Sequence, residues 1–169
     1  MSRSQSRYFL KERDLKKFLN EFSERFSVNI EEILGSSPSI EIAEISEDEI
    51  YLSDKRPILV RIDGMLSPTL IFTDMFQFLP EIVVDMGAIP YICSGADVMS
   101  PGIVRVVGSF KNNDFVLIKD ERHNETLAIG IALLDSKSMR KSKQGKMIKN
   151  IHYVGDRIWR IIKSLHSFK

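Results

Sequence analysis

The stretch VDMGAIPYICSGADVMSPGI, residues 84–103, contains the signals that decide the fold of the second half of this chain. It follows a short apolar strand, passes through a helix-like segment around Ala88 to Cys93, and ends in a loop with Gly95 and Gly102. A helix-loop-strand order is the reverse of the order that directs backbone amides at a phosphate, so this is not a Walker-type loop. A helix cap at Gly95 and a turn at Gly102 explain the glycines; alternatively, bare backbone there lets a ligand approach closely.

The segments after this loop are mostly β-like. Three apolar runs, GIVRVVG at 102–108, DFVLIK at 114–119 and TLAIGIALL at 126–134, are separated by turn-forming residues. We predict a helical turn over Ser136 to Ser142, capped by Asp135 or Ser136, and final strands at IHYV (151–154) and RIWRII (157–162). The sequence therefore predicts a mostly-β domain over 80–163, folded as a small barrel, and a basic tail over 164–169.

The residues before Pro80 predict a separate α+β domain over 1–79. Its first element is an amphipathic helix, indicated by an apolar stripe at helical spacing: Leu15, Phe18, Leu19, Phe22 and Phe26. A second, short helix is expected after the cap-like pair Asn29 and Glu32, and Gly35 ends it.

From Ser39 onward the apolar residues alternate with polar ones, which predicts an antiparallel sheet. Asp63-Gly64 lies between two apolar runs and predicts a hairpin turn. Pro68 suits the first turn of a helix that would continue until Pro80.

The composition is that of a globular protein, with 43% hydrophobic and 28% charged residues. No apolar run approaches the roughly 20 residues that cross a bilayer, and the first residues turn polar too soon for a signal peptide. We therefore expect a cytoplasmic protein with no membrane partner. The single Cys93 excludes an intramolecular disulfide and a cysteine-rich metal site.

The net charge of +1 is unevenly distributed along the chain. Residues 136–169 carry ten Lys and Arg against one acid, a net charge of +9, and residues 1–135 carry −8. Basic side chains (Lys143, Lys146, Lys149, Arg157, Arg160) alternate there with aromatic ones (His152, Tyr153, Trp159). Such a mixture favours RNA, because cations neutralise phosphates and aromatic faces stack on bases. A solvated basic tail and an ordinary core-facing strand are the alternative interpretations.

Catalytic signals are few. The three histidines, His123, His152 and His166, have no metal-ligand spacing, and Cys93 fits a buried structural residue better than a nucleophile. Asp48 and Glu49 lie in a hydrophilic connection. The chain has neither GxxxxGK[ST] nor GxGxxG, the loops for nucleotide hydrolysis and dinucleotide binding. We expect no enzyme activity, no metal and no cofactor.

Residues 84–103, Gly130 in AIGIA, and GKMIKNIHYVGDRIW at 145–159 resemble a PUA domain, the pseudobarrel named for pseudouridine synthases and archaeosine transglycosylases. Nearly all of the chain, specifically the PUA half and loosely the part before it, resembles the malignant-T-cell-amplified protein family, which has an α+β domain before its PUA domain. Pro68-Thr69-Leu70 matches that family's PTL signature. The two-domain plan is similar to that of archaeal members.

The resemblance implies RNA binding without catalysis, and it implies contact with structured RNA, either the acceptor end of tRNA or rRNA of the small ribosomal subunit. The family works with a density-regulated partner in reinitiation and recycling. The implied contact residues are Gly87, Ala88, Tyr91, Gly95, Ala96, Asp97, Met99, Lys149 and His152, and the basic pattern of the carboxyl end adds Lys143, Lys146 and Arg157.

Two other function classes stay open. The second half of the chain fits a targeting module of an RNA-modifying enzyme, with the chemistry in residues 1–79. Alternatively, the acidic stretch EIAEISEDEIYLSD at 41–54 recruits a protein partner, which would make the chain an adaptor.

Overall fold

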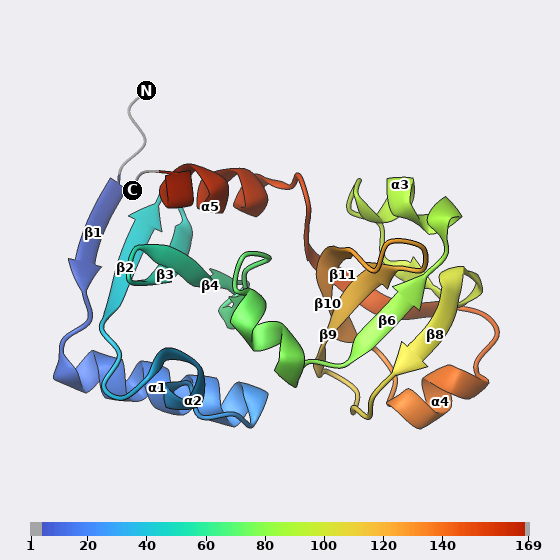
Figure 1. Cartoon of the computed structure of the whole chain (residues 1–169), viewed down its shortest axis with the longest axis horizontal. Helices are drawn as coiled ribbons and strands as arrows, with labels where there is room; N and C mark the ends of the chain where they lie inside the picture. Colours follow the sequence, from blue (N-terminus) through green and yellow to red (C-terminus); the bar gives the residue numbers. More distant parts are fainter. Residues whose placement is uncertain (1–4, 168–169) are drawn as a thin grey trace. The chain divides into compact units, whose positions relative to one another are not determined.

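The computed structural model describes residues 5–167, which divide into two compact units (Figure 1). The first unit contains residues 5–75 and 161–167, and the second contains residues 76–160. The order is the predicted one, an α+β unit followed by a mostly-β pseudobarrel. The sequence analysis predicts the domain boundary near residue 80 and a tail from residue 164. Residues 168 and 169 of that tail lie outside the described residues.

The first unit is built on a five-stranded antiparallel sheet in the order β1-β2-β3-β4-β5. The strands are β1 (Gln5–Phe9), β2 (Ile40–Ile45), β3 (Asp48–Ser53), β4 (Arg56–Ile62) and β5 (Met65–Pro68). Consecutive strands pair with each other, and Ile62 opposite Met65 closes the hairpin that Asp63-Gly64 predicts. The alternating apolar residues of β2 to β4 are buried except Ile62, but Tyr51 and Leu59, which lie between them, are buried as well, so β3 and β4 are covered on both faces.

Helix α1 (Glu12–Phe26) lies across one face of this sheet (Figure 1). Its buried Phe18 stacks on Tyr51 of β3 with 4.7 Å between ring centroids. Helix α2 (Glu31–Leu34) follows, with Glu31 N donating to Asn29 Oδ1 and with Gly35 at its C-cap. Both helices agree with the sequence prediction: the side chain of Asn29 accepts from Glu31 N, and its backbone O accepts from Glu32 N at 2.9 Å.

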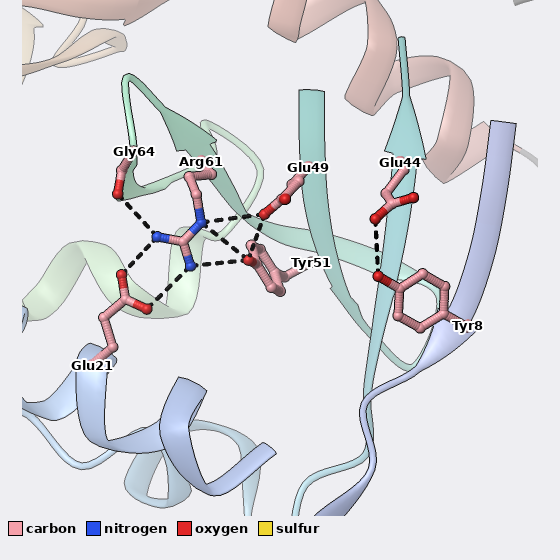
Figure 2. Close-up of polar contacts among 7 residues, drawn as sticks. All are labelled: Tyr8, Glu21, Glu44, Glu49, Tyr51, Arg61 and Gly64. Carbon is pink, nitrogen blue, oxygen red and sulfur yellow. Dashed lines mark hydrogen bonds and ion pairs between the residues drawn. The ribbon is translucent and has the colours of Figure 1, made fainter. Parts of the chain in front are cut away.

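Figure 2 shows the polar contacts that join α1 to the sheet. The Arg61 guanidinium donates to both carboxylate oxygens of Glu21 (2.7 and 3.1 Å), to Tyr51 Oη (3.0 Å) and to Gly64 O (3.0 Å). Tyr51 Oη in turn donates to Glu49 Oε2 at 3.0 Å. Burial raises the pKa of Tyr51 to about 12, so the phenol stays protonated as a donor.

Two expectations for this unit were wrong. Pro68 does not begin a helix: it ends β5 opposite Leu59, and a 3₁₀ helix, η1, starts only at Thr73 and runs to Phe78. Strand β1 was not expected at all, because each of its residues is exposed and its side chains show no apolar alternation.

The second unit holds a six-stranded sheet in the order β7-β11-β10-β9-β6-β8. Its strands are β6 (Glu81–Val84), β7 (Val98–Met99), β8 (Ile103–Val107), β9 (Phe115–Asp120), β10 (Thr126–Ala132) and β11 (Lys146–Tyr153). All pairs are antiparallel except β6 with β9. The sheet encloses a core that includes Ile82, Ile92, Val116, Ile118, Ala128, Met147 and Ile148.

Short helices connect these strands. The segment from η2 (Met86–Ala88) through α3 (Ile89–Ile92) is the predicted helix, and η3 (Ser100–Gly102) leads into β8. Helix α4 (Ser136–Lys141) is capped by Asp135, whose Oδ1 accepts from Ser138 N at 2.8 Å, as predicted.

The last element corrects the sequence interpretation, because RIWRII is not a strand. Residues Arg157–Ser167 form helix α5, and Asp156 Oδ1 accepts from Trp159 N at 2.6 Å in an N-cap arrangement. Ile158, Ile161, Ile162 and Leu165 are its buried residues, at helical spacing. Across residues 5–167, no helix is long and apolar enough to span a membrane.

Candidate nucleic-acid interface

The segment between β6 and β8 folds around a groove of about 480 Å³. The groove is lined by Asp85, Gly87, Ala88, Tyr91, Ile92, Ala96, Asp97, Val98, Met99, Pro101 and Gly102. Six of the twelve expected contact residues are among them: Gly87, Ala88, Tyr91, Ala96, Asp97 and Met99. The lining is mainly apolar, and its two charged members are both aspartates.

Two large apolar side chains stand exposed at this groove. Tyr91 of α3 is 70% exposed and Met99 of β7 is 48% exposed, although folding normally buries such residues. An aromatic face and a soft thioether beside a concave surface suit a flat apolar ligand such as a nucleobase.

Pairing of β7 with β11 brings the basic strand to the groove. Met99 lies opposite Lys146, and Val98 lies opposite Ile148. Lys146 and Lys149 are both exposed along β11, and Lys143 is exposed just before it. The structure thus brings together the groove and the lysines that the sequence placed some fifty residues apart.

Asp97 connects these two parts electrostatically. Its Oδ2 lies 2.9 Å from Lys146 Nζ, and its Oδ1 accepts from the backbone N of Asn150 at 2.8 Å. Burial by itself would raise the pKa of Asp97, but these hydrogen bonds and the charges of Lys146 and Lys149 outweigh it and lower the pKa. Asp97 therefore stays ionised, and Lys146 is already partly neutralised. Lys143 and Lys149 form no ion pair with any residue from 5 to 167.

Gly95 does not line the groove, and the need for glycine at this position has a local cause. Its φ is +97°, in the region that glycine tolerates, and a Cβ there would lie 3.3 Å from the Tyr153 ring. The residue turns the chain after α3 and packs the loop on Tyr153 of β11. The helix-cap interpretation therefore explains Gly95 without a ligand.

His152 was expected to contact RNA, but the structure buries its side chain. Its side chain is 0% exposed, and Nδ1 lies 2.8 Å from Asp156 Oδ2. The side chain points into the protein because a β-bulge at Ile129 and Gly130 sets the register of β11. Arg157, by contrast, is exposed at the start of α5.

The structural roles of two residues were not predicted from the sequence. Arg140, counted with the basic end, donates to Val106 O (3.2 Å) and Gly108 O (2.7 Å) at the outer side of the edge strand β8. Asn150 donates from Nδ2 to Ile92 O and Ala96 O, both at 3.0 Å. No sequence motif marks either role. Within the described chain no group of three His, Cys, Asp or Glu side chains could hold a metal ion.

Residues 80–154 match the PUA domain family, and residues 6–73 match a domain of unknown function, DUF1947. An uncharacterized protein of Methanocaldococcus jannaschii is 44% identical over 156 residues, which cover 90% of this chain and 94% of that protein. Translation machinery-associated protein 20 of Schizosaccharomyces pombe is 30% identical over 127 residues, 69% of this chain and 68% of that protein.

Malignant T-cell-amplified sequence 1 of Rattus norvegicus is 32% identical over 101 residues, which cover 57% of this chain and 56% of that protein. Among solved structures, a hypothetical protein from Pyrococcus horikoshii is 33% identical with a TM-score of 0.78. The alignment covers 93% of this chain and 99% of that one, so the likeness includes both units.

Proposed function

We propose that this chain, which belongs to the PUA-domain family of translation machinery-associated protein 20 and the malignant T-cell-amplified proteins, binds RNA in translation. We propose further that it does so without catalysing a reaction. The observation that carries this proposal is the pairing of β7 with β11. It sets an apolar groove with an exposed tyrosine directly beside exposed lysines. Two of the relatives are named for the translation machinery or for amplification in T cells rather than for a catalysed reaction.

The charges at the groove indicate which part of a nucleotide would bind inside it and which part outside. Its charged lining residues are Asp85 and Asp97, which repel phosphate, so a base and its ribose enter the groove. Phosphates bind outside it, at Lys143 and Lys149. Bases inside a duplex are stacked and out of reach, so the ligand is an unpaired stretch of a structured RNA. The acceptor end of tRNA has this form, as do unpaired segments of small-subunit rRNA. A density-regulated type of translation factor is the protein partner that we propose.

A titration of labelled tRNA, with and without its unpaired CCA end, tests the proposal. We expect wild type to prefer the tRNA that carries the end. The variant Lys143→Ala/Lys149→Ala should bind more weakly at low salt. Its plot of log K against log salt should be shallower by about 0.7–0.9 per lysine, because each phosphate contact releases counterions.

Lys16→Ala/Lys17→Ala on α1 is the matched control, since both residues are exposed lysines of the other unit. Equal losses in the two variants would contradict the assigned surface. Wild type that binds neither tRNA at low salt would overturn RNA binding and favour the adaptor interpretation.

A further inference from the structure

We propose that Asn150 is the positioning residue of the groove, because it fastens the loop between α3 and β7 (residues 93–97) to β11. The proposal rests on the RNA-binding function above and names the residue that holds the binding surface in shape. Asn150 is half-buried on β11 and does not line the groove.

The contacts of Asn150 reach both ends of the 93–97 loop. Its Nδ2 donates to Ile92 O, just before the loop, and to Ala96 O, near its end, each at 3.0 Å. Its backbone N donates to Asp97 Oδ1 at 2.8 Å. A single residue of β11 therefore contacts Ile92, Ala96 and Asp97, and all three of these residues line the groove.

The orientation of Asn150 follows from the β-bulge in the β10-β11 pair. Ile129 lies opposite His152 and Gly130 lies opposite Asn150, so Ile151 is an extra residue on β11. Bulges of this kind bend a strand and redirect its side chains. The strands can approach here only because residue 130 is glycine: a Cβ would overlap Ile148 and lie 2.8 Å from Lys149 O.

The amide group is specific for this position. Both partners of Nδ2 are carbonyl oxygens, so the position requires a group with two N–H donors. The other half of the amide, Oδ1, is buried and has no hydrogen-bond partner in the described chain. Within the described chain the side-chain amide is therefore held only through its Nδ2 group, which faces the loop.

The Asn150 contacts should affect RNA binding through the fraction of molecules whose 93–97 loop is in its binding-competent position. Without the Asn150 contacts the 93–97 loop would leave its closed position for part of the time, and the apparent Kd rises in inverse proportion to the fraction that remains competent. A fall of that fraction to about one tenth weakens RNA binding about tenfold. The lysines are untouched, so the salt dependence of binding stays the same.

The test compares Asn150→Ala with Asn112→Ala, an exposed asparagine in the turn before β9. Hydrogen exchange of the free protein reads the loop directly, because Gly95 N and Ala96 N donate to Ile92 O and Tyr91 O at 3.0 and 2.9 Å. We expect about tenfold faster exchange at these two amides in Asn150→Ala, about tenfold weaker tRNA binding and an unchanged salt slope. Asn150→Ser, which keeps one donor, should give intermediate values and serves if the alanine variant does not fold.

Exchange and binding equal to those of Asn112→Ala would overturn the proposal. So would faster exchange spread evenly over β10 and β11, since that indicates only a general loss of stability. If wild type fails to bind tRNA, the proposed function fails, whereas local acceleration at Gly95 and Ala96 would still support the fastening role of Asn150.

Discussion

Tyr91 is the side chain at the groove that is best placed to stack on a base, since 70% of its surface is exposed beside the apolar lining. Base stacking on an aromatic side chain contributes about 1–3 kcal/mol. Tyr91→Ala should therefore weaken RNA binding by about 5- to 150-fold, while the unfolding free energy changes little. Tyr91→Phe keeps the ring and should bind like wild type. Parallel titrations of the two variants check this, and equal binding by all three proteins would exclude stacking at this residue.

Gly130 is the residue on which the β10-β11 bulge depends, because the partner strand occupies the space of a Cβ. Gly130→Ala should lower the free energy of unfolding by about 1–3 kcal/mol through overpacking. Urea denaturation followed by the fluorescence of the single tryptophan, Trp159, measures the change. The control is Gly87→Ala, where the new Cβ would lie an ordinary 3.4 Å from Asp85 Oδ1. If both variants lose the same stability, the close approach at Gly130 does not matter.

At the scale of elements, Asp156 joins the end of β11 to the start of α5. Its carboxylate accepts from Tyr153 N at 2.9 Å and Trp159 N at 2.6 Å, and it faces His152 Nδ1. Burial favours the neutral acid, but the hydrogen bond and charge of His152 and the two amides prevail and lower the pKa of Asp156.

A lowered pKa stabilises the fold above the unfolded-state value of about 3.9 and loses that effect as the pH falls through the lower folded-state value. Asp156→Asn should reduce the unfolding free energy at pH 7 by about 1–2 kcal/mol, since the amide cannot accept from all three donors. The difference between the variant and wild type should begin to shrink as the pH falls below about 4 and should disappear below the lowered pKa of Asp156. Urea denaturation between pH 2 and 7 tests this, and a constant difference at every pH would contradict it.

Arg61 has the corresponding role in the first unit, where it joins α1 to β3 and β4 (Figure 2). Arg61→Lys keeps the charge but loses the two-pronged contact with Glu21 and the bond to Tyr51, so we expect a loss of about 1–2 kcal/mol in unfolding free energy. Arg13→Lys, at an exposed position of α1, is the control and should change it little. The comparison is made by urea denaturation, and equal stability of both variants would show that the network contributes nothing.

Elements with one buried face could be predicted from the sequence, because burial imposes a period on their side chains. The stripe through Phe18 and Phe22 of α1 is an example. Strand β1 has no buried face, so nothing in its sequence distinguishes it from a loop. The apolar residues of RIWRII suit a strand until Leu165 completes the helical spacing of α5.

The candidate site was predictable to a similar extent. Residues 84–103 contain every groove-lining residue, because the groove is formed within one continuous segment. The inward side chain of His152 and the role of Asn150 depend on a bulge between β10 and β11, and strand pairing of this kind leaves no local signal in either segment.

At the scale of the whole molecule, charge is divided between the units. Residues 76–160 carry twelve Lys and Arg against nine Asp and Glu, whereas residues 1–75 and 161–169 together carry twelve against fourteen. The net charge of +1 therefore conceals a unit suited to a polyanion and a unit that repels one. The proposed function places the RNA on the second unit, at the groove and at β11.

Chemical-shift mapping tests that claim most directly, with the ¹⁵N-labelled full chain titrated with an RNA hairpin that ends in unpaired ACCA. We predict shifts concentrated in residues 85–102 and 143–153, with residues 5–75 nearly unchanged. Shifts centred on the first unit, or no shifts at all at low salt, would contradict it.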